Sequence, residues 1–338
     1  MPRALQSVPA AVAGLLLLAA CGSQSASQED AGARAGDAGG VRSEALCPSD
    51  VQQYGSPPPP ADPPSGTPSP LPLPSPAATG ESGVRVTGLY AWGEGSGCAA
   101  DYSAEFEVTN QGTEAVTYTV TVGFLSASGG AVDNVERTVE SVGPGRTVKA
   151  AVALREPAVQ APDVTGVDVI EVRSVPAAET SSDAGPCPAS GVRVYADRGD
   201  AAMGLRAVGL HLVNCGTRPY RVDGYPELEL LDEDHDPVDG VRILHGTDRI
   251  STGLRGGDSP RPVVLRPGEA AVASLAWRNT TGFGAAVNAP YARVRAKPGA
   301  DPVTVVPEFD LGTTGKLGVG PWERDETYRD AATGTPRP

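Results

Sequence analysis

Apolar and polar residues alternate in short runs along most of the chain after residue 82. The clearest runs are Tyr102–Val108, Tyr118–Phe124, Val148–Leu154, Val208–Leu212, Leu228–Leu230 and Ala271–Trp277. Alternation with a period of two places successive side chains on opposite faces of a strand, so each run predicts a half-buried strand. No segment keeps a sustained helical period. The pattern therefore predicts a chain that is nearly all β.

Two halves of this region also resemble each other, in the same order along the chain. The matches are Ser82–Val86 with Ser190–Val194, Val108–Thr113 with Leu212–Thr217, and Gly143-Pro144-Gly145 with Arg266-Pro267-Gly268. Gly, Val and Thr abound in all β proteins, which is the alternative explanation of the matches. Ordered repeats favour a duplicated unit, and Gly-rich turns suit antiparallel sandwiches. We expect two tandem immunoglobulin-like antiparallel β-sandwich domains behind a disordered Pro-rich spacer.

Composition shifts place the expected boundaries. They are residues 1–20 for a signal peptide, 21–46 for a disordered leader, 47–81 for the Pro-rich spacer, 82–176 for the first sandwich, 177–186 for a linker, 187–312 for the second sandwich and 313–338 for a disordered tail.

The N-terminus carries the pattern Leu18-Ala19-Ala20-Cys21 behind an apolar run, and this resembles a bacterial lipoprotein signal. The resemblance implies a diacylglyceryl group on the Cys21 sulfur and a mature chain that begins at Cys21, held by palmitate-type acyl chains on the extracytoplasmic face of the cell membrane. The apolar run is too short to span a bilayer as a stable helix. An ordinary secretory signal cleaved after Ala20 is the alternative.

Eleven prolines between Gly55 and Gly80 exclude a helix or an interior strand there. At about 3.1 Å per residue, the stretch predicts a semi-rigid spacer of roughly 80 Å between the membrane and the folded part. A Pro-rich recognition ligand is the alternative.

The net charge of −14, from 27 basic and 41 acidic residues, argues against nucleic acid as a partner. The same acidity disfavours adhesion of a protein face to anionic lipid, so we expect the membrane to be a partner through the N-terminal lipid alone.

Five cysteines are present. If Cys21 carries lipid, four remain, and an even number in an exported chain suggests disulfides. Four cysteines allow three connectivities. We favour Cys187–Cys215 because both belong to one expected domain, which leaves Cys47–Cys98. Unpaired or intermolecular thiols remain open as an alternative.

The second half resembles a domain of unknown function that is common in actinobacterial envelope lipoproteins. The motifs that carry the resemblance are Cys187, Leu212-Val213-Asn214-Cys215-Gly216-Thr217, Gly224-Tyr225-Pro226, Leu265-Arg266-Pro267-Gly268 and Trp277. It covers about residues 187–312 and implies an immunoglobulin-like sandwich behind a lipid anchor and a low-complexity linker. It implies no catalytic residue. The sequence departs from the family in having no cysteine after Cys215.

Candidate chemistry is sparse. Only three histidines are present and no Gly-x-Ser-x-Gly motif occurs, so we expect no enzyme activity, no catalytic residue and no cofactor. His211 alternates with Leu210 and Leu212, which predicts a solvated or hydrogen-bonded histidine on the outer sheet face.

Asp232, Asp234 and Asp236 form the one constellation with ligand chemistry, because carboxylates two residues apart suit Ca²⁺. Pro237 and Ile243 stand where an EF-hand loop needs Gly and Glu, so a charged hairpin tip is the alternative. Tyr225 predicts either a corner that ties down a loop or, with Trp277 and Tyr220, a wall of a ligand groove. The identity of a ligand is not encoded in these motifs.

The sequence thus predicts a lipid-anchored cell-envelope protein with a non-catalytic binding or scaffolding role, whose partner is an envelope protein or a cell-wall glycan. The alternative is an extracytoplasmic small-ligand or Ca-binding module that is presented to a membrane partner.

Overall fold

A computed structural model describes residues 46–47, 67–73, 83–93, 96–155, 162–257 and 259–328. The named regular elements of this part of the chain are strands and two 3-10 helices, Ala177–Glu179 (η1) and Thr247–Arg249 (η2), which confirms the nearly all-β prediction. No helix in the described ranges is long and apolar enough to cross a membrane. The expected signal peptide and the expected lipidation residue Cys21 lie outside the described residues.

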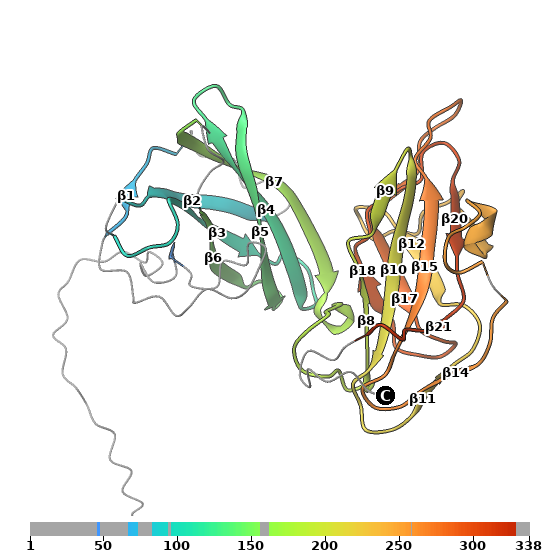
Figure 1. The fold of residues 1–338 in the computed structure, drawn as a ribbon. Coiled ribbons are helices and arrows are strands. Elements are labelled where there is room, and N and C mark those ends of the chain that lie inside the picture. The colour runs from blue at the N-terminus through green and yellow to red at the C-terminus, as the bar shows by residue number, and fades with distance from the viewer. Residues whose placement is uncertain are drawn as a thin grey trace, which may run out of the picture. The chain divides into compact units, whose positions relative to one another are not determined.

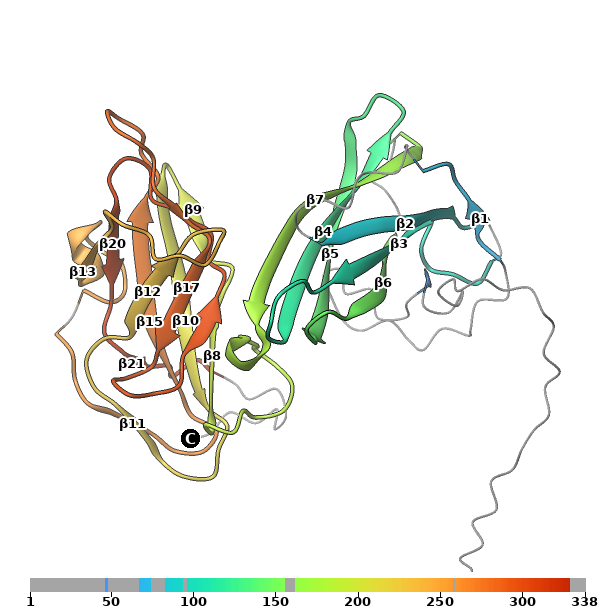
Figure 2. The ribbon, with the colours of Figure 1, turned by 180° about the vertical axis from the view of Figure 1, so that it is seen from behind.

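The first domain is a sandwich of two antiparallel sheets (Figures 1 and 2). One sheet has the order β1-β2-β3-β6 and the other β5-β4-β7. The strands are β1 (Ser69–Pro70), β2 (Val84–Ala91), β3 (Tyr102–Thr109), β4 (Val116–Ser126), β5 (Ala131–Val142), β6 (Thr147–Leu154) and β7 (Val164–Pro176). Most apolar positions of the alternating runs face inward, and Phe106, Val120 and Phe124 are fully buried, whereas Val148 at the start of β6 is exposed.

The second domain has a large sheet of order β13-β20-β15-β10-β8, to which β9 and β21 are added, and a facing sheet β12-β17-β18. Two short pairs, β11–β14 and β16–β19, complete it. The strands are β8 (Val192–Ala196), β9 (Asp200–Ala202), β10 (Leu205–Asn214), β11 (Tyr220–Val222), β12 (Glu227–Leu231), β13 (Arg242–His245), β14 (Val263–Leu265), β15 (Ala270–Arg278), β16 (Asn288–Ala289), β17 (Tyr291–Arg295), β18 (Val303–Val305), β19 (Phe309–Asp310), β20 (Lys316–Val319) and β21 (Glu323–Arg324). Among these strand pairs, β13–β20 is parallel and the others are antiparallel.

A buried asparagine occupies the same place in both domains. Asn110 follows β3, and its amide nitrogen donates to the carbonyls of Glu114 and Val142, both at 2.7 Å. Asn214 ends β10, and its amide nitrogen donates to the carbonyls of Arg218 at 2.8 Å and Leu265 at 2.9 Å.

The Pro-Gly turn that recurs in the sequence closes onto each asparagine. Gly145 donates its backbone N–H to the Asn110 carbonyl at 2.8 Å, and Gly268 donates to the Asn214 carbonyl at 2.7 Å. The repeated motifs therefore build the same hydrogen-bonded junction twice, which confirms the tandem sandwiches.

The expected disordered tail, residues 313–338, is wrong for residues 313–328. β20 lies between β13 and β15 in the large sheet, and Trp322 is 2% exposed in the core. The Trp322 indole donates to the Ala296 carbonyl at 2.9 Å. Leu317 and Val319 alternate over a run too short to stand out as a strand in the sequence, and their burial comes from the neighbouring strands.

The expected Pro-rich spacer, residues 47–81, also contacts the first domain. Leu46 is buried, and Cys47 is bonded to Cys98. Residues 69–70 pair with β2, and Leu71 donates its N–H to the Leu89 carbonyl at 2.8 Å. Prolines are tolerated here because β1 is an edge strand, where a missing N–H leaves no ladder bond unmade. Residues 67–73 are therefore docked against β2 rather than a free spacer.

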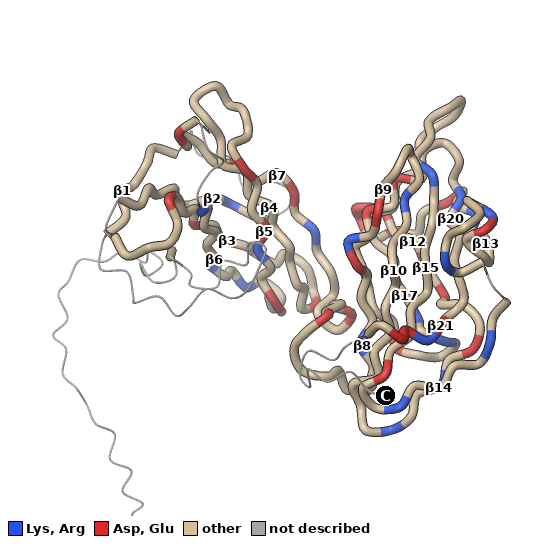
Figure 3. Tube along the Cα trace, viewed as in Figure 1, with Lys and Arg blue, Asp and Glu red and all other residues tan. Residues whose placement is uncertain are grey.

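The expected linker, residues 177–186, is likewise held by the second domain. Glu179 pairs with Arg293 at 2.8 Å and accepts a bond from the hydroxyl of Thr304 at 2.8 Å. Ser181 donates its hydroxyl to the Val194 carbonyl at 3.1 Å. The second domain thus begins near residue 177. Basic and acidic residues are interspersed over the described part, with no stripe of Lys and Arg (Figure 3).

Replacing Asn110 or Asn214 by alanine should lower the free energy of unfolding of the domain that contains it by about 3 kcal/mol, because two carbonyls lose their partners in a buried place. Urea unfolding followed by tryptophan fluorescence measures the loss. Asn134→Ala, an exposed position on β5, is the matched control and should change the value by less than about 0.5 kcal/mol. An Asn variant as stable as this control would contradict the structural role.

Candidate functional site

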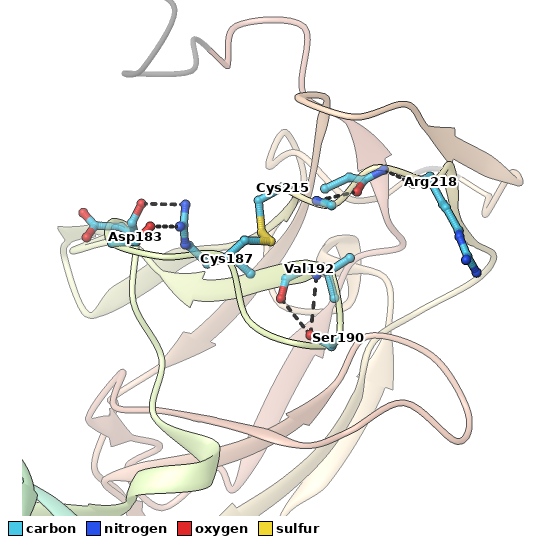
Figure 4. The surroundings of a disulfide bond; sticks show 10 residues. Asp183, Cys187, Ser190, Val192, Cys215 and Arg218 are labelled. Atoms are coloured by element: carbon cyan, nitrogen blue, oxygen red, sulfur yellow. Dashed lines mark hydrogen bonds between the residues drawn. A yellow bond between two sulfur atoms is a disulfide. The ribbon is translucent and has the colours of Figure 1, made fainter. Parts of the chain in front are cut away.

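The disulfide between Cys187 and Cys215 joins the segment before β8 to the residue that follows β10, with a sequence separation of 28 (Figure 4). Beside it, Gly216 donates its backbone N–H to the Gly191 carbonyl at 2.8 Å. A Cβ on Gly216 would lie 3.0 Å from the Gly191 Cα, so the two segments touch only because Gly216 has no side chain. The predicted pairing, with Cys47–Cys98 as the second bridge, is present in the structure.

A pocket of about 410 Å³ adjoins this disulfide. Its walls come from the segment before β8, from β8 itself, from Tyr220 and from the β17–β18 turn. The apolar side chains in these walls are short or rigid, while the polar ones are Thr180, Ser182, Ser190, Arg193, Lys297 and Asp301. The volume lies in the range of small-molecule sites.

Arg193 holds one wall of the pocket in place. Its guanidinium donates to the carbonyl of Gly185 at 2.6 Å and to that of Asp183 at 3.4 Å. These bonds tie the segment before the disulfide to β8. The Arg193 guanidinium is therefore bonded within the protein, where it holds this wall of the pocket in position.

Tyr220 and the β17–β18 turn form the side of the pocket that carries Lys297 and Asp301. The Lys297 ammonium lies 4.0 Å from the centroid of the Tyr220 ring and donates to the Arg221 carbonyl at 3.2 Å. Burial raises the pKa of the Tyr220 phenol, and the nearby Asp301 carboxylate raises it further. Tyr220 thus stays a neutral hydroxyl that can donate or accept a hydrogen bond.

A second polar cluster lies on the outer face of the large sheet, around His211. The His211 Nε2 is 3.1 Å from Asp197 Oδ2, and its Nδ1 is 3.8 Å from Asp325 Oδ2. The ring stacks on Tyr195 with centroids 4.9 Å apart. Burial raises the pKa of Tyr195 to about 12, helped by the charges of Tyr328, Asp183 and Asp325.

Asp197 in this cluster has most of its acceptors occupied. Its Oδ1 accepts the backbone N–H of Gly209 at 2.8 Å and that of Gly199 at 2.9 Å. Burial alone would raise the pKa of Asp197, but the bonds from His211, Gly209 and Gly199 outweigh it and lower that pKa. The pair lies over Gly209, where a Cβ would be 2.4 Å from Asp197 Oδ2.

The hollow beside His211 measures about 320 Å³. Within it, His211 is hydrogen-bonded to Asp197, and its Nδ1, which has no hydrogen-bond partner among the described residues, faces Asp325 at 3.8 Å. His211 is thus a hydrogen-bonded histidine of the outer face, as its alternation predicts, and the cluster has a structural role.

The three carboxylates predicted for calcium form a turn instead. Asp232 Oδ1 accepts the backbone N–H groups of Asp234 at 3.0 Å and Asp236 at 2.9 Å, which is the geometry of a turn cap. Glu233 pairs with Arg173, and His235 Nε2 is 2.7 Å from the Ser174 carbonyl. In the described ranges, no group of three or more His, Cys, Asp or Glu side chains is arranged to hold a metal ion.

The predicted groove of Tyr225, Trp277 and Tyr220 does not form. Trp277 is 2% exposed in the core and donates its indole N–H to Asp310 at 2.6 Å. Tyr225 stacks on His245, with centroids 4.1 Å apart. Of these three residues, only Tyr220 lines the pocket beside the Cys187–Cys215 disulfide. Sequence reasoning missed Lys297 and Asp301, for which the only available signal was two opposite charges in a Pro- and Gly-containing turn.

Comparisons with known proteins identify the second domain. Residues 187–323 match the family described as "Domain of unknown function (DUF4232)", so a domain of this family is present and contains the Cys187–Cys215 disulfide. No curated protein matches the chain. Among solved structures, the crystal structure of red sea bream transglutaminase matches with 13% identity, 70% of this chain, 30% of that chain and a TM-score of 0.16, a likeness too low to carry an argument.

Asp197→Asn should test the outer-face cluster through pH. Because the folded-state pKa of Asp197 is lowered, its contribution is present above the unfolded pKa and is lost as pH falls through the folded value. With a side chain 44% exposed, we expect a loss of about 0.5 kcal/mol at pH 7 that is smaller at pH 3.

Urea unfolding at both pH values measures the difference. Asp200→Asn, at an exposed position of the neighbouring β9, is the control. A destabilisation that stays constant between the two pH values would refute the electrostatic role of Asp197.

Proposed function

We propose that this chain is a lipid-anchored protein of the cell envelope with a non-catalytic binding role, and that its ligand or partner enters the pocket beside the Cys187–Cys215 disulfide. The Leu18-Ala19-Ala20-Cys21 pattern supports the anchor. Two disulfides support an oxidising, extracytoplasmic location. The domain of unknown function in the second half is compatible with this role and names no ligand.

The pocket is the observation that favours binding over scaffolding. It combines a defined volume of about 410 Å³ with walls held by a disulfide, by Arg193 and by the bonds of the segment before β8. Pre-formed walls lower the entropy cost of binding because they are not ordered by the ligand. A purely scaffolding protein needs no such cavity.

An envelope protein or a cell-wall glycan is the partner class that we propose. The net charge of −14 and the interspersed charges of the described surface disfavour nucleic acid, which requires a basic stripe (Figure 3). The small-ligand part of the alternative function uses the same pocket. Its calcium part has no support from the turn at Asp232, whose carboxylate already caps the turn.

Cys21→Ala should move the protein from the membrane fraction to the soluble fraction of the producing cells, because the acyl chains provide the proposed attachment. Fractionation and incorporation of a labelled fatty acid measure the effect. Cys98→Ala is the matched control, since it removes a cysteine of the first domain and should leave both the label and the fraction unchanged. Labelled Cys21→Ala protein in the membrane fraction would overturn the anchor.

A photo-reactive residue at Ser190, in the pocket rim, should form a light-dependent adduct with an envelope component on intact cells. The same residue at Thr138, exposed on β5 of the first domain, should form none. Ala189→Trp, which places a large ring in the pocket mouth, should reduce the Ser190 adduct at least fivefold.

Adducts of equal yield at both positions, or a Ser190 adduct that persists in the Ala189→Trp protein, would refute the pocket as the binding site. Intact mass and the presence of both disulfides verify that each variant is folded before its yield is compared.

A further inference from the structure

Two opposite charges line the pocket from one short turn. Lys297 and Asp301 lie between β17 and β18 and are four residues apart. The turn is closed by the Ala300 N–H, which donates to the Lys297 carbonyl at 3.0 Å, and by Arg295, which donates to the Ala300 carbonyl at 2.7 Å. The turn that carries both residues is therefore held by one backbone bond and by one bond from the Arg295 guanidinium.

These two charges are not paired with each other or with another ion. Within the described residues, Lys297 donates only to the Arg221 carbonyl and rests on the Tyr220 ring, and Asp301 forms no hydrogen bond or ion pair. An ammonium has three donors, so Lys297 keeps donors for a ligand. The carboxylate of Asp301 keeps its acceptors. Arg193 also lines the pocket, but its guanidinium donates to two backbone carbonyls. The pocket thus offers a ligand the free donors of the half-buried Lys297 and the carboxylate of the exposed Asp301.

The remaining walls suit a small aliphatic body. Pro186, Pro188 and Pro302 are rigid rings, and Ala189 and Val303 add short apolar surface. Lys297 and Asp301, beside these apolar walls, bind most strongly to ligand groups of opposite charge, because charge-assisted hydrogen bonds are stronger than neutral ones.

We propose that this pocket binds a small zwitterion, specifically a short peptide with small side chains and both ends free. The peptide carboxylate binds Lys297, the peptide ammonium binds Asp301, the Tyr220 hydroxyl bonds to the peptide backbone, and the aliphatic side chains lie on the proline walls. This inference rests on the binding role proposed above and adds the chemical class of the ligand.

The test uses the purified full-length chain and calorimetric titration with alanyl-alanine, with its N-acetyl derivative and with its C-terminal amide. We expect binding of the free dipeptide and a loss of roughly tenfold in affinity when either end is blocked, because each block removes one charge-assisted bond.

Variants assign the two ends. Lys297→Gln should lower the affinity for the free dipeptide to that for the C-terminal amide. The variant should still bind the free dipeptide more tightly than the N-acetyl derivative. Asp301→Asn should lower the affinity for the free dipeptide to that for the N-acetyl derivative. The variant should still bind the free dipeptide more tightly than the C-terminal amide. Lys149→Gln and Asp133→Asn, in the first domain, are matched controls that should bind as the parent does.

Equal binding of all three peptides would overturn the zwitterion while leaving the pocket as a binding site. Absence of binding up to the solubility of the dipeptide would also overturn the zwitterion. The Ser190 adduct then separates the two proposals, because its presence keeps the binding role and its absence removes both.

Discussion

Both sandwiches depend on one buried amide at the end of a central strand. Asn110 follows β3 of one sheet and binds the carbonyl at the end of β5 in the facing sheet, and Asn214 makes the corresponding bonds in the second domain. Each side chain is 1% exposed. A buried amide without partners would cost several kcal/mol, so the turns around it must adopt the one arrangement that satisfies it. The amide therefore joins the two sheets in the first domain, and in the second it joins β10 to β14 of the short β11–β14 pair.

In the second domain this junction leads directly to the pocket. Asn214 is followed by Cys215, whose disulfide holds the segment of Cys187, and by Gly216, whose missing side chain allows contact with Gly191. Three consecutive residues thus position the sheet junction, the covalent bridge and a pocket wall. The bridge ties this wall covalently to the end of β10, and it also stabilises the folded domain because it restricts the unfolded chain.

Some charged side chains of this protein are bonded to other groups of the chain and have a structural role, whereas others keep free donors or acceptors for a ligand. Around His211, the Asp197 carboxylate already accepts two backbone N–H groups and faces the imidazole, and in the acidic turn Asp232 caps the backbone. The carboxylates of Asp197 and Asp232 therefore accept bonds from within the protein. Lys297 keeps free donors and Asp301 keeps free acceptors, and both line one open pocket in which Lys297 is half-buried and Asp301 is exposed. Groups held in place with capacity left over are the ones available to a ligand.

The sequence by itself determined the β class and the tandem domains, because alternation and repeated Asn-x-Gly-Thr motifs are local signals. It favoured one cysteine pairing out of three, and the structure decided for that pairing. Only the tertiary structure decided that Trp322 belongs to the core, that residues 177–186 form a pocket wall, and that Asp232 caps a turn. These outcomes depend on which distant strand or carbonyl a segment meets. Alternation with a period of two predicts which side chains of a strand are buried, but it does not predict which distant residues they pack against. The walls of a pocket depend on that packing.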